Sequence, residues 1–262
     1  MTPRQPSLQT LDSAARPLRW LDPLLGIALA GALTMLLTTA LPGTARAADR
    51  VIGNGQAASE QRQLAGFDSV QTDGPTVLVR QGTVAAVTVQ ADANLLPLLE
   101  TVIEGQRLVV RWQRGSSQRT SVKPVVTVTA VKLASLVVSG SGDLVGEALR
   151  SPALAVRVEG SGDLRLVDLS ADELSVSVRG SGNVQASGSA ARLSISIAGS
   201  GDVKTRGLKA DAVSVRIAGS GDADVQAQRT LDVTIAGSGD VVYSGAASVK
   251  KSIAGSGSVT QR

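Results

Sequence analysis

The chain has 262 residues, of which 26 are basic and 22 acidic, so its formal net charge is +4; it contains neither cysteine nor histidine. These two absences exclude disulfides, thiolate or imidazole metal sites, and Ser-His-Asp or Cys-His catalytic units. Aromatic residues make up only 2% of the chain, which leaves few side chains that could stack on bases or sugar rings. The hydrophobic content of 43% is sufficient for a folded core.

The first 47 residues have the order of a secretory signal peptide. Three arginines precede an apolar run at 24–41, and the small-residue motif Ala45-Arg46-Ala47 follows the run. We therefore expect residues 1–47 to be removed by cleavage after Ala47, and the protein to reach the periplasm or the surface of a bacterial cell. The alternative is an uncleaved membrane anchor, because about 18 apolar residues lie at the lower limit for spanning a bilayer.

Removal of this segment changes what the charge implies. The segment contains four arginines and two aspartates, so the rest of the chain has 22 basic and 20 acidic residues. A net charge of +2 does not indicate nucleic acid, which usually demands a concentrated basic stripe. After cleavage we expect no membrane span, no nucleic-acid partner and no cofactor.

The remainder of the chain divides into an irregular part and a repetitive part. Residues 48–66 are interpreted as a linker with the first strands, residues 67–132 as an N-terminal β region, and residues 133–262 as a repeat domain. In the N-terminal region, Asn94 is placed to cap a short helical turn over 95–99. Apolar runs predict strands at 77–79, 84–89, 101–103, 108–112 and 125–131, with a hairpin at Glu104-Gly105. We expect this region to cap or open the repeat domain.

The tripeptide Gly-Ser-Gly recurs in residues 133–262, and this recurrence predicts a solenoid. It begins at Gly140, Gly160, Gly180, Gly199, Gly219, Gly237 and Gly255, at intervals of 18 to 20 residues. Before each tripeptide, apolar and polar residues alternate, which is typical of a strand with one buried face. Counting back two, four and six residues from the first glycine gives three inward columns, namely Val138, Val158, Val178, Ile197, Ile217, Ile235 and Ile253; Leu136, Val156, Val176, Ile195, Val215, Val233 and Lys251; and Ala134, Leu154, Leu174, Leu193, Val213, Leu231 and Val249.

Each repeat unit predicts one coil of an all-β, right-handed parallel β-helix, a β-solenoid with coils of 18–20 residues. The unit reads as a tight turn, a strand, a looser corner such as 168–172 or 207–211, and a second strand. Neighbouring coils would lie about 4.8 Å apart, and right-handed crossovers are the default for parallel strands. An antiparallel meander is the alternative, but it is disfavoured because Gly-Ser-Gly occurs once per unit and not at every turn.

The turn residues are interpreted as structural. Paired glycines tolerate the positive φ of a sharp corner, and Ser and Asp can bond nearby backbone amides. The predicted structural turn residues are Gly140, Gly142, Asp143, Gly160, Gly162, Asp163, Gly180, Gly182, Asn183, Gly199, Gly201, Asp202, Gly219, Gly221, Asp222, Gly237, Gly239, Asp240, Gly255 and Gly257. The alternative is a calcium-binding ladder of stacked carboxylates, but Asn183 and Ser258 interrupt the aspartate column. No catalytic, cofactor-binding or metal-binding residue is assigned.

Three segments and the repeat together resemble one family. The segments are Phe67–Val89, Ala91–Leu96 and Val102–Leu108, and the serial Gly-Ser-Gly-Asp is the most specific part. With these features the chain resembles the bacterial head GIN domain family, which is described as auto-transporter adhesins. The resemblance implies a two-sheet β-helical fold with Gly-Ser-Gly at the tight turns, and it implies no established catalytic residues.

Two classes of function remain open. The first is an exported, non-enzymatic envelope or surface protein that binds an unknown protein or polysaccharide partner. Polar residues that point outward would form rows, and these rows would be either a flat binding surface for the partner or simply a solvated face. The residues are Ser175, Ser177, Ser194, Ser196, Ser214 and Thr234, and Arg157, Arg179 and Arg216 interrupt them. The second class is a polysaccharide-active lyase or hydrolase, since β-helices host such enzymes. A catalytic carboxylate pair is expected as a local exception to the repeat, whereas Asp163 and Asp202 belong to the repeated turn.

Overall fold

A computed structural model describes residues 50–262, and the predicted signal peptide at 1–47 lies outside them. The described part contains nineteen β-strands and one short 3₁₀ helix, Leu96–Leu98. None of its helices is long and apolar enough to cross a membrane. The structure therefore confirms the predicted all-β class.

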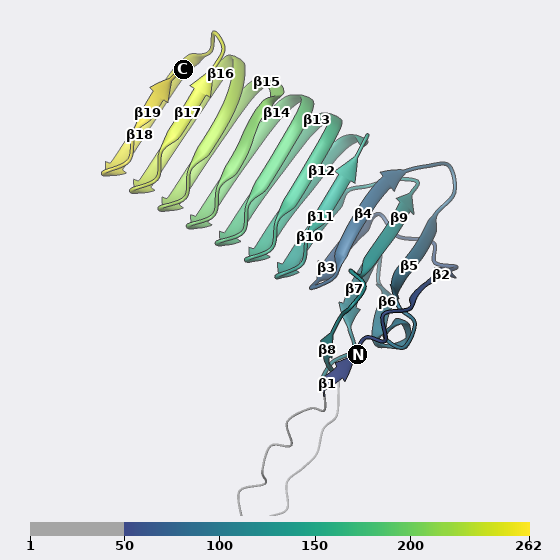
Figure 1. Cartoon of the computed structure of the whole chain (residues 1–262). Coiled ribbons are helices and arrows are strands. Elements are labelled where there is room, and N and C mark those ends of the chain that lie inside the picture. The colour runs from purple at the N-terminus through teal and green to yellow at the C-terminus, as the bar shows by residue number, and fades with distance from the viewer. Residues whose placement is uncertain (1–49) are drawn as a thin grey trace, which may run out of the picture. The chain divides into compact units, whose positions relative to one another are not determined.

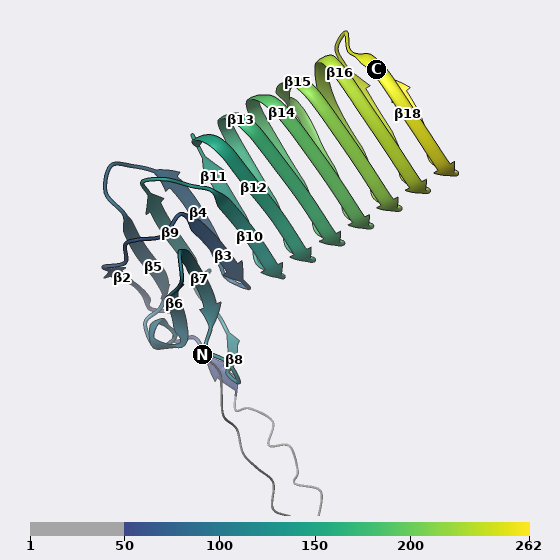
Figure 2. The same cartoon turned by 180° about the vertical axis from the view of Figure 1, so that it is seen from behind.

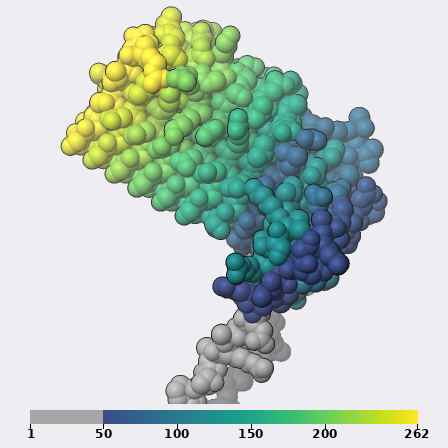
Figure 3. Space-filling model, viewed as in Figure 1, coloured from purple at the N-terminus to yellow at the C-terminus, as the bar shows by residue number. Residues whose placement is uncertain are grey.

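The repeat domain forms a stack of coils whose strands pair in parallel (Figures 1 and 2). Its strands are β10 (Ser135–Gly140), β11 (Leu144–Glu147), β12 (Arg150–Gly160), β13 (Leu164–Gly180), β14 (Val184–Gly199), β15 (Val203–Gly219), β16 (Ala223–Gly237), β17 (Val241–Ser244), β18 (Ser248–Gly255) and β19 (Val259–Gln261). Each strand is in register with its counterpart one coil on, so that Val156 faces Val176 and Val176 faces Ile195. This parallel pairing confirms the solenoid and excludes the meander. Side chains accordingly form rows across the coils (Figure 3).

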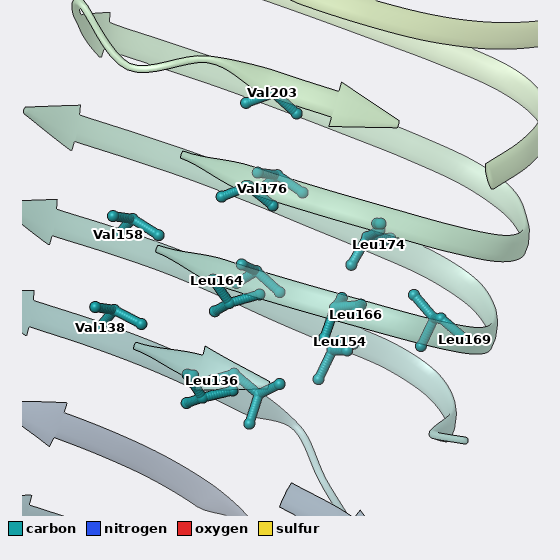
Figure 4. Close-up of a cluster of buried hydrophobic side chains, with 14 of the residues drawn as sticks. Leu136, Val138, Leu154, Val158, Leu164, Leu166, Leu169, Leu174, Val176 and Val203 are labelled. Atoms are coloured by element: carbon teal, nitrogen blue, oxygen red, sulfur yellow. The ribbon is translucent and has the colours of Figure 1, made fainter. Parts of the chain in front are cut away.

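The inward columns form the core of the solenoid (Figure 4). Val176 is 1% exposed, and it stacks between two equally apolar neighbours. One predicted position differs from the pattern at the first repeat, where Ala134 is exposed and Leu133 is buried in its place. The last coil differs too, because Lys251 is exposed and Ile253 is 39% exposed. Burial of these stacked aliphatic side chains is the main term that stabilises the coils.

The looser corner does not interrupt the strands. From β13 to β16, each strand runs from one tight turn to the next, and it bends midway. Register shifts mark the bends, for example between Leu166 and Leu169 and between Thr205 and Lys209. Asp168 adopts φ +55° at one of them, a conformation that is uncommon outside glycine. Because these strands continue through the bend, the two faces of the solenoid belong to one 17-stranded sheet.

The parallel ladder continues into the N-terminal region. Strands β3 (Ser69–Asp73) and β4 (Thr76–Gln81) pair in parallel with β10 and β11. They form a coil whose tight turn, Gly74-Pro75-Thr76, is one residue shorter than the Gly-Ser-Gly-Asp turn that lies opposite it. Behind them, β7 (Arg107–Trp112) pairs with β3, and β9 (Val125–Ala130) pairs with β4. Of the two roles expected for this region, capping or opening the repeat domain, the structure shows the second, because β3 and β4 form the first coil of the solenoid.

Antiparallel strands end the parallel ladder at the N-terminal end of the solenoid. Strand β5 (Ala86–Asp92) lies between β9 and β2 (Ala57–Arg62), and β6 (Leu99–Glu104) forms the predicted hairpin with β7. A separate pair joins β1 (Arg50–Ile52) to β8 (Ser117–Arg119). The predicted helical turn is present, but Asn94 does not cap it. The Asn94 side chain instead accepts from the backbone N–H of Asn54 and donates to the carbonyl of Ile52.

Candidate functional site: the turn edge and the outer faces

The predicted turn glycines stack on one another along one edge of the solenoid. The first glycine of every Gly-Ser-Gly has positive φ, from +73° at Gly140 to +144° at Gly219. A Cβ at Gly219 would overlap the carbonyl oxygen of Gly199, and a Cβ at Gly221 would overlap that of Gly201. The carbonyl of the first glycine in a turn accepts the backbone N–H of the serine in the turn of the next coil. The Gly160 carbonyl, for example, accepts the N–H of Ser181 at 2.9 Å. Both glycines are therefore required by coil-to-coil contact, and the first also by its backbone angle.

From the second Gly-Ser-Gly on, the polar residue after the turn forms a hydrogen-bond ladder between coils; among the described residues, Asp143 makes no such bond to the next coil. The Oδ1 of Asp163 accepts the backbone N–H of Asn183 at 2.9 Å, and Asn183 Oδ1 accepts that of Asp202 at 3.1 Å. The ladder continues from Asp202 to Asp222 at 3.1 Å, from Asp222 to Asp240 at 2.8 Å and from Asp240 to Ser258 at 2.7 Å. The sequence suggested bonds to nearby amides, whereas the structure shows bonds to the amide one coil further on.

The ladder explains why asparagine fits in the aspartate column. The amide oxygen of Asn183 accepts the same kind of bond, and its amide nitrogen also donates to Asp163 Oδ1 at 3.0 Å. One carboxylate oxygen of Asp163 and one of Asp202 are engaged as acceptors in this way. Within residues 50–262, no group of three or more acidic side chains is placed to hold a metal ion.

The outer side of strands β12 and β18 and of the second halves of β13–β16 is a flat polar surface, here called the serine face. Ser175, Ser194 and Ser214 lie side by side on three successive coils. The next row runs from Arg157 through Ser177 and Ser196 to Arg216 and Thr234. The side chains on this face are short, and several arginines project from it. A shallow hollow of ≈ 310 Å³ lies on it, lined in part by Arg192, Ser194 and Ser214. The face as a whole can offer many hydrogen bonds to a large partner.

The outer side of β11, of the first halves of β13–β16 and of β17 is here called the charged face. One row on it passes through Arg165, Gln185, Lys204 and Asp224 on successive coils. Near the bends, Arg206 and Ser187 join this row around a shallow hollow. These residues fall outside the Gly-Ser-Gly columns, so the periodicity of the sequence does not identify them.

A buried carboxylate lies in the N-terminal region and was also not expected. Asp92 is fully buried at the end of β5. Its Oδ1 accepts the backbone N–H of Gly55 at 2.8 Å, and its Oδ2 accepts those of Ser121 and Val122 at 2.9 and 3.0 Å. Burial alone would raise the pKa of Asp92, but these three donors outweigh it and lower the pKa below its usual value. Asp92 thus fastens two loops to β5 and has a structural role.

Comparison with known proteins agrees with this architecture. Residues 66–247 match the family model described as "Putative auto-transporter adhesin, head GIN domain". Among curated proteins, none matches the chain significantly. A crystal structure of a putative lipid binding protein from Parabacteroides distasonis is similar, with 26% identity, a TM-score of 0.69, and coverage of 81% of this chain and 99% of that one.

Two further crystal structures share the fold. A putative adhesin from Bacteroides fragilis is 20% identical, with a TM-score of 0.74 and coverage of 81% of this chain and 100% of that one. A putative adhesin from Parabacteroides distasonis is 25% identical, with a TM-score of 0.67 and coverage of 82% and 100%. The family match extends from the first coil through most of the repeat domain. The chain therefore belongs to the head GIN domain family of auto-transporter adhesin-like proteins.

Proposed function

We propose that this chain is an exported, non-enzymatic protein of the bacterial cell envelope or surface, which binds its partner through the outer faces of its solenoid. The signal peptide predicted at 1–47 supports export. The adhesin description of the family and the binding role named for one structural neighbour support a binding function.

The observation that carries the proposal is the register of the outer side chains. Parallel pairing holds equivalent positions of successive coils side by side, as in the row of Ser175, Ser194 and Ser214. The backbone of these strands is fixed by hydrogen bonds on both sides, so the rows need little ordering when a partner binds. A rigid, repetitive surface of this kind suits an extended or macromolecular partner better than a single small substrate.

The acidic side chains of the solenoid support a non-enzymatic role. The turn carboxylates accept backbone N–H groups in the ladder. On the outer faces, Glu159 pairs with Arg179 at 3.2 Å, and Glu173 pairs with Arg192 at 3.4 Å on the next coil. A glycoside hydrolase or lyase needs carboxylates that face its substrate. The carboxylates of the ladder and of these two ion pairs already interact with groups of the protein itself.

Export and binding can be tested together. The full chain is expressed in a bacterium, the cells are fractionated, and the N-terminus of the exported protein is sequenced. We expect the mature protein to begin at Ala48 and to retain components of an envelope extract on an affinity column. A cytoplasmic protein that begins at Met1 would contradict export, and an empty column would contradict binding. Turnover of a uronic-acid polymer would contradict the non-enzymatic assignment.

A further inference from the structure

The charged face contains a hollow of ≈ 310 Å³ where the coils β13, β14 and β15 bend. Arg165, Gln185 and Lys204 form its wall on three successive coils, and Arg206 and Ser187 come from the bends. The cations at 165 and 204 are two coils apart, so their backbone positions are separated by about 10 Å.

Local backbone irregularity explains the hollow. The pairing register shifts between Gln185 and Ser187, and again between Thr205 and Lys209. Gly207 lies at one of these shifts and lines the hollow without a side chain. The surface is therefore depressed at this point of the charged face.

The hollow has an excess of positive charge. Among residues 50–262, neither Arg165 nor Arg206 has an acidic group within ion-pair distance. Lys204 lies 3.4 Å from Asp202, and the carboxylate of Asp224 is shared with Arg262 at 3.4 Å. Three cations thus line the hollow with one carboxylate, and the two arginines keep their donors available.

From this geometry we propose that the hollow binds an acidic polysaccharide, and that Arg165 and Arg206 hold its carboxylate or sulfate groups. The inference rests on the proposed function, because it names the partner class of the same outer surface. Arginine forms strong, directional hydrogen bonds to such oxoanions. Gln185 and Ser187 supply neutral donors and acceptors for sugar hydroxyls between the charges.

The lining favours a polysaccharide over a lipid surface. None of the exposed large hydrophobic side chains of the described part lines the hollow. Membrane association without an apolar anchor would depend on a denser cluster of cations than these three. Stacking on aromatic rings is not needed either, since the charges and the neutral polar groups supply the contacts. The hollow is open at the surface, so an extended chain can pass through it.

The test measures binding of the purified protein to polygalacturonate and dextran sulfate, with neutral dextran as the uncharged probe. The hollow variant is Arg165→Gln/Arg206→Gln. The control variant is Arg114→Gln/Lys123→Gln, which removes the same charge from exposed positions of the N-terminal region, where neither cation has an ion-pair partner among residues 50–262. Vesicles of phosphatidylcholine with phosphatidylglycerol form a separate arm.

We expect wild type to bind at least one acidic polymer, and salt to weaken this binding. The hollow variant should bind about tenfold more weakly, and the control variant should bind as wild type does. Equal losses in both variants would show a general charge effect and overturn the proposal. Binding to vesicles alone, or to no acidic polymer, would also overturn it. If wild type still retained envelope components in that case, the proposed function would stand with a different partner class.

Discussion

The side chain of Asp202 accepts a hydrogen bond from the backbone N–H of Asp222, at 3.1 Å and one full coil away. The same bond recurs from Asp163 to Ser258 wherever the turn residue is Asp or Asn. Each acceptor therefore fixes the position of the next turn. From Asp163 on, this stacking explains the aspartate column, and its carboxylates lie in exposed or half-exposed corners where water and salt reduce their repulsion.

We expect the thermal stability of the protein to be independent of calcium. Chelator treatment should leave the melting temperature unchanged, because the ladder uses backbone donors and not a metal ion. The variant Asp202→Asn/Asp222→Asn should be nearly as stable as wild type, since Asn183 shows that an amide oxygen can take this place. A rise of several degrees on addition of millimolar Ca²⁺, absent in the double variant, would contradict this account.

The turn glycines should tolerate no side chain. Gly219→Ala should destabilise the protein by about 3 kcal/mol or more, because it combines an unfavourable positive φ with an overlap on the Gly199 carbonyl. Gly207→Ala serves as the control, since its Cβ would lie 3.2 Å from Ser187 Cβ and its φ is not in the left-handed region. Urea unfolding measures both. A small effect at Gly219, equal to that at Gly207, would show that the turns do not stack as described.

The inward and outward assignments of a single strand can be separated by one substitution on each side. Val176→Asp places a carboxylate between Val156 and Ile195 and should lower the free energy of unfolding by several kcal/mol. Ser177→Asp lies on the serine face beside Arg157 and should be nearly neutral. Melting temperatures of the two variants report the difference. Equal destabilisation by both would mean that the register is wrong.

Asp92 should make the stability of the protein depend on acid pH. Its pKa is lowered in the folded state from a reference of 3.8, so its ionised form stabilises the fold above that value. This contribution is lost as the pH falls below 3.8 toward the lowered pKa. We expect Asp92→Asn to be less stable than wild type at pH 7, with the difference shrinking below pH 3.8. Urea titrations between pH 2.5 and 7 measure it, and a constant difference would contradict the assignment.

Much of the solenoid could be predicted because the Gly-Ser-Gly turn and the inward apolar columns recur once per coil. The first coil, β3 and β4, carries no Gly-Ser-Gly and was not assigned as one. Its turn is exempt because no tight turn stacks beneath it: a Cβ at Gly74 would meet only the side chain of Trp112, at 3.5 Å. Gly74 corresponds to the first glycine and keeps a positive φ of +108°. Without a carbonyl below, no second glycine is required, and Pro75 and Thr76 complete a turn that is one residue shorter.

Other features depend on contacts that sequence periodicity does not specify. The alternation fails at Ala134 because β10 begins only at Ser135, and Leu133 enters the core from the preceding segment. The hollow follows from register shifts at the bends, whose positions differ from coil to coil. Asp92 binds amides from residues 55, 121 and 122, which only the closed N-terminal region brings together.

The central claim is that the outer faces of the solenoid, and not its turn edge, bind the envelope partner. One variant combines Ser194→Tyr and Ser196→Tyr on the serine face with Arg165→Gln and Arg206→Gln on the charged face. Its matched control combines Ser200→Tyr and Ser220→Tyr on the turn edge with Arg114→Gln and Lys123→Gln in the N-terminal region, all of them exposed positions. The measurement is the amount of envelope material that each purified protein retains, after thermal unfolding has shown that both are folded. The account predicts a strong loss for the outer-face variant and wild-type retention for the control, and equal retention by the two variants would contradict it.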